Sequence, residues 1–190
     1  MVGLFYKNIK DPIEYGLLNE GQDTYYKPMN FGTANNWGLE VDILKYFNWL
    51  GIKANYTYTY SKITTEKRVM QGSEVTTTTQ SRPLFGQAAH VANISFLLKD
   101  SKHGWEGQLA MGYTGKRLSD ISNWADNDIW EKGYTQLDAS IEKTLPRGFC
   151  LFLKASNLLN IPVLRYVHQS ERTANAVSYT HLTLPTNSRV

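Results

Sequence analysis

The stretch that decides the fold is Ile52-Lys53-Ala54-Asn55-Tyr56-Thr57-Tyr58-Thr59-Tyr60-Ser61. One parity of this stretch has an isoleucine, an alanine and three tyrosines, and the other has only polar side chains. Successive side chains of a β-strand point to opposite faces of its sheet. The stretch therefore predicts a strand with one apolar and one polar face.

The same alternation continues along most of the chain, and helical spacing is hard to find. It recurs in residues 105–114 and 136–142, where apolar and polar side chains again occupy opposite parities. Further strands are expected at residues 3–10, 36–47, 91–99 and 149–157. With residues 52–61 these segments make seven candidate strands.

The connections between these strands alternate in length. Three are short and contain turn-forming residues, at residues 48–51, 100–104 and 145–148. Three are long and polar, at residues 11–35, 64–86 and 119–133. Tight turns at one end and long loops at the other are typical of bacterial outer-membrane barrels. We therefore predict an all-β fold: an antiparallel, up-and-down transmembrane β-barrel fragment of about seven strands, forming a curved open sheet.

Charges and aromatic rings on the apolar parity agree with a membrane wall. Lys45 and Lys143 are the charges on the otherwise apolar parities of their strands, and each lies close to a short turn. A lysine there can extend into the headgroup region, whereas at mid-bilayer it would cost about 2–4 kcal/mol. Aromatic residues lie towards strand ends on the same parity, as an interfacial belt requires: Phe47, Tyr60, Trp105, Tyr113 and Phe149. A half-buried soluble sheet also scatters such residues, so this pattern alone leaves both alternatives open.

Composition excludes several classes of protein. The 190 residues contain 20 Lys and Arg and 17 Asp and Glu, a net charge of +3, and no basic and aromatic stripe, so we expect no nucleic-acid partner. No apolar run approaches the roughly 20 residues of a transmembrane helix. The single cysteine, Cys150, excludes an internal disulfide and a cysteine-cluster metal site.

A hydrolase site at His90, Asn93 and Ser95 is the first catalytic candidate, because these residue types converge in outer-membrane phospholipases. On a regular strand, however, His90 points to the opposite face from the other two. We therefore interpret His90 as a rim residue and the others as polar groups of the lumen.

Acidic residues give two further candidates. Glu40 and Asp42 share one parity and could form an acid and base pair, but in a barrel they would line the polar lumen. Asp126, Asp128 and Glu131 could suggest calcium, but their segment lacks the glycine and ligand count of an EF-hand, so a solvated external loop is expected. We predict no enzyme, no catalytic, cofactor-binding or metal-binding residue, no cofactor, and assign no substrate-binding residue.

Several short segments follow one another in a characteristic order. They are residues 4–14, 35–40 and 56–59, the pair Gly86-Gln87 with His90 and Asn93, and residues 157–160. Together they resemble the C-terminal barrel of TonB-dependent outer-membrane receptors, over nearly the whole chain up to about Val167. Residues 126–133, followed by 136–138, resemble in particular the versions common in Bacteroides-type bacteria.

The resemblance implies a location in the bacterial cell outer membrane and a function in nutrient uptake. Such receptors have a plug domain inside a barrel of 22 strands, and the TonB energy transducer pulls on a box ahead of the plug. It therefore implies outer-membrane lipid and TonB as partners, a possible surface lipoprotein, and a glycan, siderophore or vitamin as ligand. The seven strands would be late strands of the barrel, with plug, signal peptide and final strand missing.

The end of the chain breaks the rhythm of strands and turns. Residues 176–190 resemble translated adapter sequence more than a native segment, so we expect residues 1–175 to form the partial barrel and residues 176–190 to be a non-native tail. Two other hypotheses stay open: an independent porin-like or adhesive outer-membrane barrel, and a soluble β-barrel binding protein of the lipocalin kind. In the soluble alternative, the tyrosine-rich parity of residues 52–61 would face a protein core.

Overall fold

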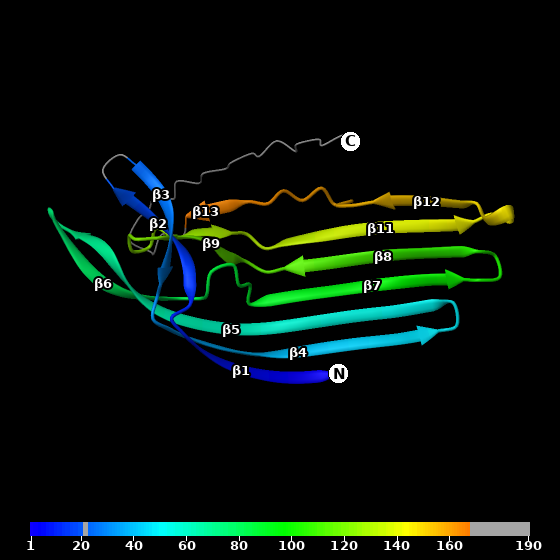
Figure 1. Cartoon of the computed structure of the whole chain (residues 1–190), viewed down its shortest axis with the longest axis horizontal. Coiled ribbons are helices and arrows are strands. Elements are labelled where there is room, and N and C mark those ends of the chain that lie inside the picture. Colours follow the sequence, from blue (N-terminus) through cyan, green and yellow to red (C-terminus); the bar gives the residue numbers. More distant parts are fainter. Residues whose placement is uncertain (21–22, 168–190) are drawn as a thin grey trace.

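The computed structural model describes residues 1–20 and 23–167, and the tail expected at residues 176–190 lies outside this part. Its main body is a curved antiparallel sheet whose long strands lie side by side (Figure 1). In order across the sheet the strands are β1 (Val2–Lys10), β4 (Thr33–Phe47), β5 (Leu50–Gln71), β7 (His90–Asp100), β8 (Trp105–Thr114), β11 (Tyr134–Thr144) and β12 (Cys150–Ala155). These are the seven predicted strands, and we call them the wall.

The short connections of the wall are tight, as predicted. Asn48, with φ 50°, forms the turn between β4 and β5, and Gly104, with φ 65°, ends the turn between β7 and β8. A side chain at Gly104 would also come within 3.0 Å of the Thr144 carbonyl oxygen, so glycine is required there. The third connection, between β11 and β12, contains the short 3₁₀ helix η1 (Pro146–Gly148).

The three long connections were predicted as loops, and this prediction was wrong because most of their residues form strands. Residues 64–71 extend β5, and β6 (Glu74–Arg82) pairs with this extension. A second sheet has the order β13 (Arg165–Val167), β10 (Ile129–Glu131), β9 (Arg117–Ser122), β2 (Ile13–Glu20) and β3 (Asp23–Asn30). We call it the outer sheet. Its β2 and β9 pair in parallel, in contrast to the antiparallel pairing predicted throughout.

The register of the wall separates apolar from polar side chains. Across β5, β7, β8 and β11, one row of paired residues reads Ala54, Ile94, Met111 and Leu137. The adjacent row, on the opposite face, reads Asn55, Asn93, Gly112 and Gln136. The apolar parities of neighbouring strands therefore lie on the same side of the sheet, so the wall has one apolar face and one polar face.

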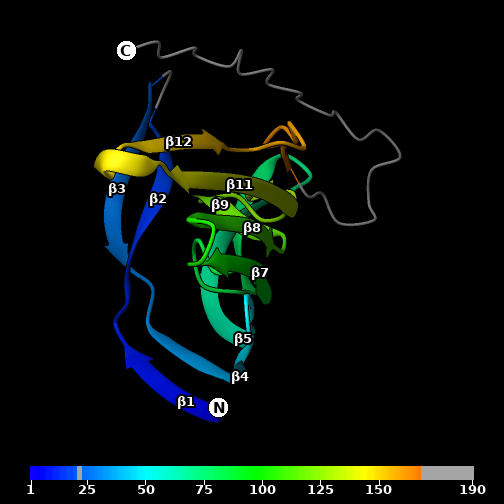
Figure 2. The ribbon, with the colours of Figure 1, turned by 90° about the vertical axis from the view of Figure 1, so that its right-hand side faces the viewer.

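The apolar face is the convex one. Viewed along the strands, the wall forms an arc from β1 to β12, and β2 and β3 cross its open, concave side (Figure 2). Ser61, Ile63, Thr65 and Lys67 are buried beneath the outer sheet, and they share the parity of the polar face. Tyr60, on the other parity, is 44% exposed. The expectation that the tyrosine-bearing side of residues 52–61 lies on the exterior is confirmed.

The height of the apolar face matches a lipid bilayer. Trp37 and Phe47 both lie on this face and stand ten residues apart in β4. At about 3.3 Å per residue and a strand tilt of about 40°, they are separated by about 25 Å along the membrane normal. That is the height of the apolar band of outer-membrane barrels, which aromatic residues flank on both sides.

Lys45 and Lys143, near the short turns, lie at the edge of the apolar band, as the sequence predicted. The Lys45 ammonium lies 5.9 Å from the ring centre of Phe47, and the Lys143 ammonium 4.6 Å from that of Trp105. Lys143 also donates a hydrogen bond to the carbonyl oxygen of His103, in the turn beyond the strand. Both side chains therefore keep their charge at the edge of the apolar band.

A small buried core lies where the wall meets the outer sheet. Its apolar members come from β4, β5, β9 and the segment before β7: Ala34, Ile63, Ala88, Leu118 and Ile121. Among the residues described, no helix has the length and apolar character needed to cross a membrane.

Candidate functional site

The three long connections, which in an outer-membrane barrel would be candidates for external contact, come together in one place. The hairpin of β2 and β3, the extension of β5 with β6, and the pair of β9 and β10 all lie at the end of the wall opposite the short turns (Figure 1). Long connections of outer-membrane barrels face the cell exterior. The sequence predicted the side on which these segments lie, but not that buried ion pairs and hydrogen bonds join them.

One buried ion pair joins β6 to β2. Arg82 Nη2 donates to Glu14 Oε2 at 2.7 Å, and the side chains are only 2% and 6% exposed. The second carboxylate oxygen of Glu14 accepts a hydrogen bond from the Phe85 backbone at 2.7 Å, and the guanidinium lies 5.0 Å from the ring centre of Phe31. Removing one partner of such a pair leaves an uncompensated buried charge, which costs about 3–5 kcal/mol.

A second buried ion pair joins β5 to the segment between β9 and β10. The Lys67 ammonium donates to Asp128, and Asp128 also accepts a hydrogen bond from the Ser122 backbone at 2.8 Å. Burial lowers the pKa of Lys67 from its ordinary value, and the bond to Asp128 opposes this shift. Lys67 lies in the part of β5 beyond the apolar band, so its charge is accommodated by protein and not by lipid.

The acidic segment after β9 is therefore not the solvated loop that its composition indicated. Asp128 and Glu131 are each 4% exposed. Glu131 accepts from Arg117 Nη2 at 2.6 Å, and Asp126 accepts from the Gln80 side chain at 2.8 Å. These carboxylates have cationic or amide partners, and no group of three or more His, Cys, Asp or Glu among the described residues is placed to hold a metal ion.

A pocket of about 370 Å³ opens beside these contacts, and we call it the outer pocket. Its lining combines two aromatic rings, two cations, two carboxylates and three smaller groups: Trp130, Tyr166, Arg82, Lys116, Asp126, Asp128, Gln80, Ser81 and Pro83. The Lys116 ammonium lies 5.6 Å from the ring centre of Trp130. Arg82 Nε is buried and, within the described part of the chain, has no acceptor. The pocket can stack a ring and bond to polar groups.

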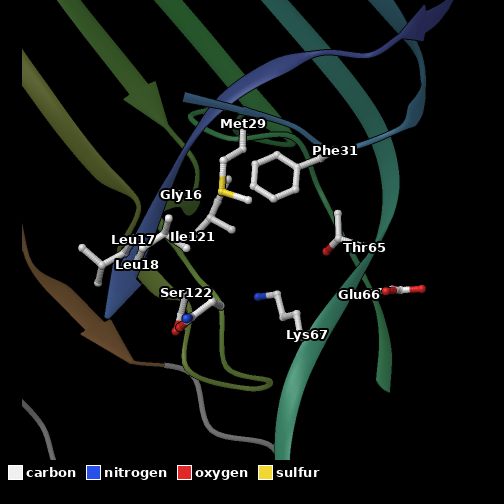
Figure 3. Close-up of a pocket in the computed structure, with 11 residues that line it drawn as sticks. Gly16, Leu17, Leu18, Met29, Phe31, Thr65, Glu66, Lys67, Ile121 and Ser122 are labelled. Atoms are coloured by element: carbon white, nitrogen blue, oxygen red, sulfur yellow. The ribbon is translucent and has the colours of Figure 1, made fainter. Parts of the chain in front are cut away.

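A smaller cavity of about 60 Å³ lies between the outer sheet and β5 (Figure 3). Met29, Phe31 and Ile121 supply its apolar side, and Thr65 and Lys67 of β5 face them. Thr65 Oγ1 is buried without a hydrogen-bond partner in the structure as described. The volume corresponds to about two water molecules, so this cavity is too small for a nutrient.

The remaining residues singled out from the sequence are kept apart by the wall. His90 lies on the apolar face, where its Nδ1 is 2.8 Å from the Tyr56 hydroxyl, whereas Asn93 lies on the polar face and donates to Asn55 at 2.8 Å. The expected separation of His90 from Asn93 and Ser95 is confirmed. Glu40 is on the polar face as well, paired in register with Thr57.

Asp42 follows Glu40 on the polar face and pairs in register with Asn55. The expectation that Glu40 and Asp42 line the lumen side is confirmed.

Sequence reasoning missed the outer pocket because Arg82, Lys116 and Tyr166 are separated by long stretches of chain. Trp130 was noted only as part of residues 126–133, with no contact assigned to it.

Comparison with known proteins gives one result. The family model described as TonB dependent receptor-like, beta-barrel matches residues 1–158. No curated protein and no solved structure matches the chain. The matched range includes all seven strands of the wall and four strands of the outer sheet.

Proposed function

The chain belongs to the TonB-dependent receptor-like β-barrel family, and from this premise we propose that it takes part in the active uptake of a nutrient such as a glycan, siderophore or vitamin. Members of this family are outer-membrane receptors, and this chain is part of a barrel wall. The identity of the nutrient and the residues that contact it are the proposed part.

The two faces of the wall support the transport proposal. Lipid contains no hydrogen-bond partners for backbone groups, so strands can cross it only as a closed barrel with an apolar exterior. The convex face provides that exterior, and the polar face with Asn55, Asn93 and Gln136 would line a water-filled lumen. Solute would pass along this polar side without any reaction, in accordance with a receptor and not an enzyme.

The observation on which nutrient contact rests is the outer pocket. Arg82 and Gln80 of β6 share the parity of Ile63 and Lys67, so the pocket lies on the concave, lumen side of the arc. Its aromatic rings, charges and amide suit a ligand with both flat and hydrogen-bonding surfaces. A solute captured there would already be positioned at the outer mouth of the lumen.

Three partners are included in the proposal. TonB would supply energy through the plug region, because a barrel wall has no energy source of its own. A surface lipoprotein would deliver or enclose the nutrient on the outer side. The Bacteroides-type origin indicated by residues 126–133 belongs to this proposal as well.

A binding experiment tests the nutrient contact. The detergent-solubilised chain is titrated with an oligosaccharide mixture, a ferric siderophore and cobalamin, and intrinsic tryptophan fluorescence is recorded. We expect one class to change the fluorescence and Trp130→Ala to remove the response. Trp49→Ala is the matched control, since Trp49 is an exposed tryptophan of a short turn at the other end of the wall.

Two results would contradict the proposal. One is the absence of a response to all three classes, and the other is an equal loss of response in Trp49→Ala and Trp130→Ala. Uptake that persists in cells after the proton-motive force has been dissipated would favour an independent porin-like barrel instead of an energised receptor.

A further inference from the structure

A row of aromatic side chains marks the outer end of the apolar face. Tyr6, Trp37 and Tyr60 pair in register across β1, β4 and β5. The rings of Trp37 and Tyr60 are in contact, with centroids 5.5 Å apart, and Trp37 also meets Tyr58 edge to face at 5.8 Å. Tyrosine and tryptophan rings in such rows lie at the boundary between lipid tails and headgroups. This row therefore places the headgroup layer of the outer leaflet directly beyond it.

The next row outward is polar. Asn8, Asn35 and Lys62 pair across the same three strands, and Lys10 lies one row further on β1. Asn8 Nδ2 donates to Asn35 Oδ1 at 2.8 Å, and the Tyr6 hydroxyl donates to the same oxygen at 3.1 Å. Since this oxygen accepts both bonds, the NH₂ group of Asn35 is turned away from them and offers donors to another molecule.

The two lysines of this region are not paired with acids. Lys10 and Lys62 are exposed, and neither forms an ion pair with an acid in the described part of the chain. Most acids within the paired rows of the wall lie on the opposite, polar face: Glu40, Asp42, Glu106, Asp138 and Glu142. The exception, Asp100, pairs with Trp105 at the inner end of the convex face, at the other end of the wall from these lysines. On the convex face of β5 the nearest acid is Glu66, four residues further outward from Lys62. Asp11 directly follows Lys10 and is also exposed. Two lysines therefore lie beside one neighbouring acid, and the local excess of charge is positive.

The inner end of the same face has lysines but no neighbouring amides. Lys45 and Lys143 each cover an aromatic ring, and no amide row lies beside them. At the outer end, two lysines and two amides occupy neighbouring rows of three adjacent strands. Clusters of cations next to a membrane surface recognise anionic headgroups, and phosphate accepts hydrogen bonds from both ammonium and amide groups.

We propose that Asn8, Lys10, Asn35 and Lys62, which we call the outer lysine patch, bind the phosphate groups of an outer-leaflet glycolipid headgroup. The inference goes beyond nutrient uptake and rests only on the membrane placement contained in the proposed function. Continuity with the aromatic row selects a lipid as occupant, because a ligand anchored in the leaflet meets this row and the patch together.

The full chain in neutral detergent micelles provides the test, with bound lipid counted by native mass spectrometry. The probes are diphosphorylated lipid A, its dephosphorylated form and inorganic phosphate. At about fivefold in affinity for each lysine, we expect the diphosphorylated form to bind about 25-fold more tightly than the dephosphorylated form. Lys10→Gln combined with Lys62→Gln should remove this preference, and the two corresponding arginine substitutions should keep it.

Lys53→Gln combined with Lys154→Gln is the matched control, because both lysines are exposed on the polar face of the same wall. This variant should retain the full preference. Equal binding of both lipid A forms, equal loss in the two double variants, or displacement of the lipid by inorganic phosphate at similar concentrations would overturn the inference. A dimer that disappears with the lysines would also overturn it, in favour of a second copy as occupant.

Membrane placement is measured separately in the same samples. Shielding of Trp37 from aqueous acrylamide, taken as the difference between the wild type and Trp37→Phe, reports whether the apolar face is covered. A shielded Trp37 without phosphate preference would overturn only the headgroup inference. An unshielded Trp37 would overturn the membrane placement and the headgroup inference together.

Discussion

The wall and the outer sheet are both made of β-strands, but different interactions specify them. In the wall, apolar and polar residues alternate within each strand. Strands that are neighbours in the sheet are connected along the chain by a hairpin or a long connection. The outer sheet contains strands as short as three residues, and the buried pair of Arg82 and Glu14, which are 68 residues apart, joins it to β6. A local pattern specifies the wall, whereas long-range charge pairing specifies the outer sheet.

Breaking the Arg82–Glu14 pair should have the largest effect. Glu14→Ala leaves the Arg82 guanidinium buried without its carboxylate, and we expect a loss of about 3–5 kcal/mol in the stability of the outer sheet. Hydrogen exchange of the β2 and β6 amides measures this loss. Lys99→Gln is the control, because the Lys99–Glu106 pair is 66% and 54% exposed and should contribute less than about 1 kcal/mol. A comparable loss in both variants would contradict the distinction.

A charge on the lipid side of the wall should have the next largest effect. Ile94 lies midway along the apolar face, and Ile94→Arg should cost about 2–4 kcal/mol of unfolding free energy in a bilayer. Ser95→Arg places the same charge one residue away on the polar face. Urea titration in lipid vesicles should show a loss only for the first variant. If both variants are equally unstable, the two faces are assigned wrongly.

The Ile94 variant tests a feature that the sequence predicted, and the Glu14 variant tests one that it did not. Seven strands and the direction of the tyrosines followed from parity, because period-two alternation directly reports a sheet with two different faces. The three short turns followed from their turn-forming residues. Most of the outer sheet was mistaken for loops because its segments are polar and contain Gly, Asn and Asp, which are common in turns. Its strands form only where distant segments supply partners. Asp128 and Glu131 are the clearest example, since an acidic stretch appears solvated until Lys67 and Arg117 are brought beside it.

Replacing a turn glycine of the wall should have a smaller effect on stability. Gly104 has φ 65° and lies against the Thr144 carbonyl oxygen, so Gly104→Ala should cost about 1–2 kcal/mol for the left-handed backbone and a further amount for this contact. Gly72 has φ 66°, but a methyl group at this position would meet no atom within 4 Å, so Gly72→Ala bears only the backbone part of this cost. Unfolding midpoints of the two variants should therefore differ, with Gly104→Ala the lower. Equal midpoints would mean that the contact with β11 is unimportant.

The smallest expected effect concerns pH and the outer sheet alone. Tyr26 donates a hydrogen bond to Asp120 at 2.7 Å, and this bond raises the pKa of Tyr26 above its ordinary value of 10.0. The folded state then favours the protonated phenol. The resulting stability is complete below pH 10.0 and is lost as the pH rises through the higher folded-state pKa.

Tyr26→Phe should flatten this alkaline slope in a series of unfolding midpoints. Tyr15→Phe, at another exposed tyrosine of the outer sheet, should leave the slope as in the wild type. If the stability of Tyr26→Phe falls with rising alkaline pH as steeply as that of the wild type, groups other than Tyr26 cause the loss.

The length of β5 has a mechanical consequence. Its 22 residues span roughly 70 Å at about 3.3 Å per residue, well beyond the 9–11 residues that a bilayer requires. A single unbroken strand therefore runs from the inner rim of the membrane to the outer end of the wall, where it pairs with β6, which lines the outer pocket. Because the strand is continuous, we expect a displacement of its outer part on solute capture to be transmitted along it towards the inner rim.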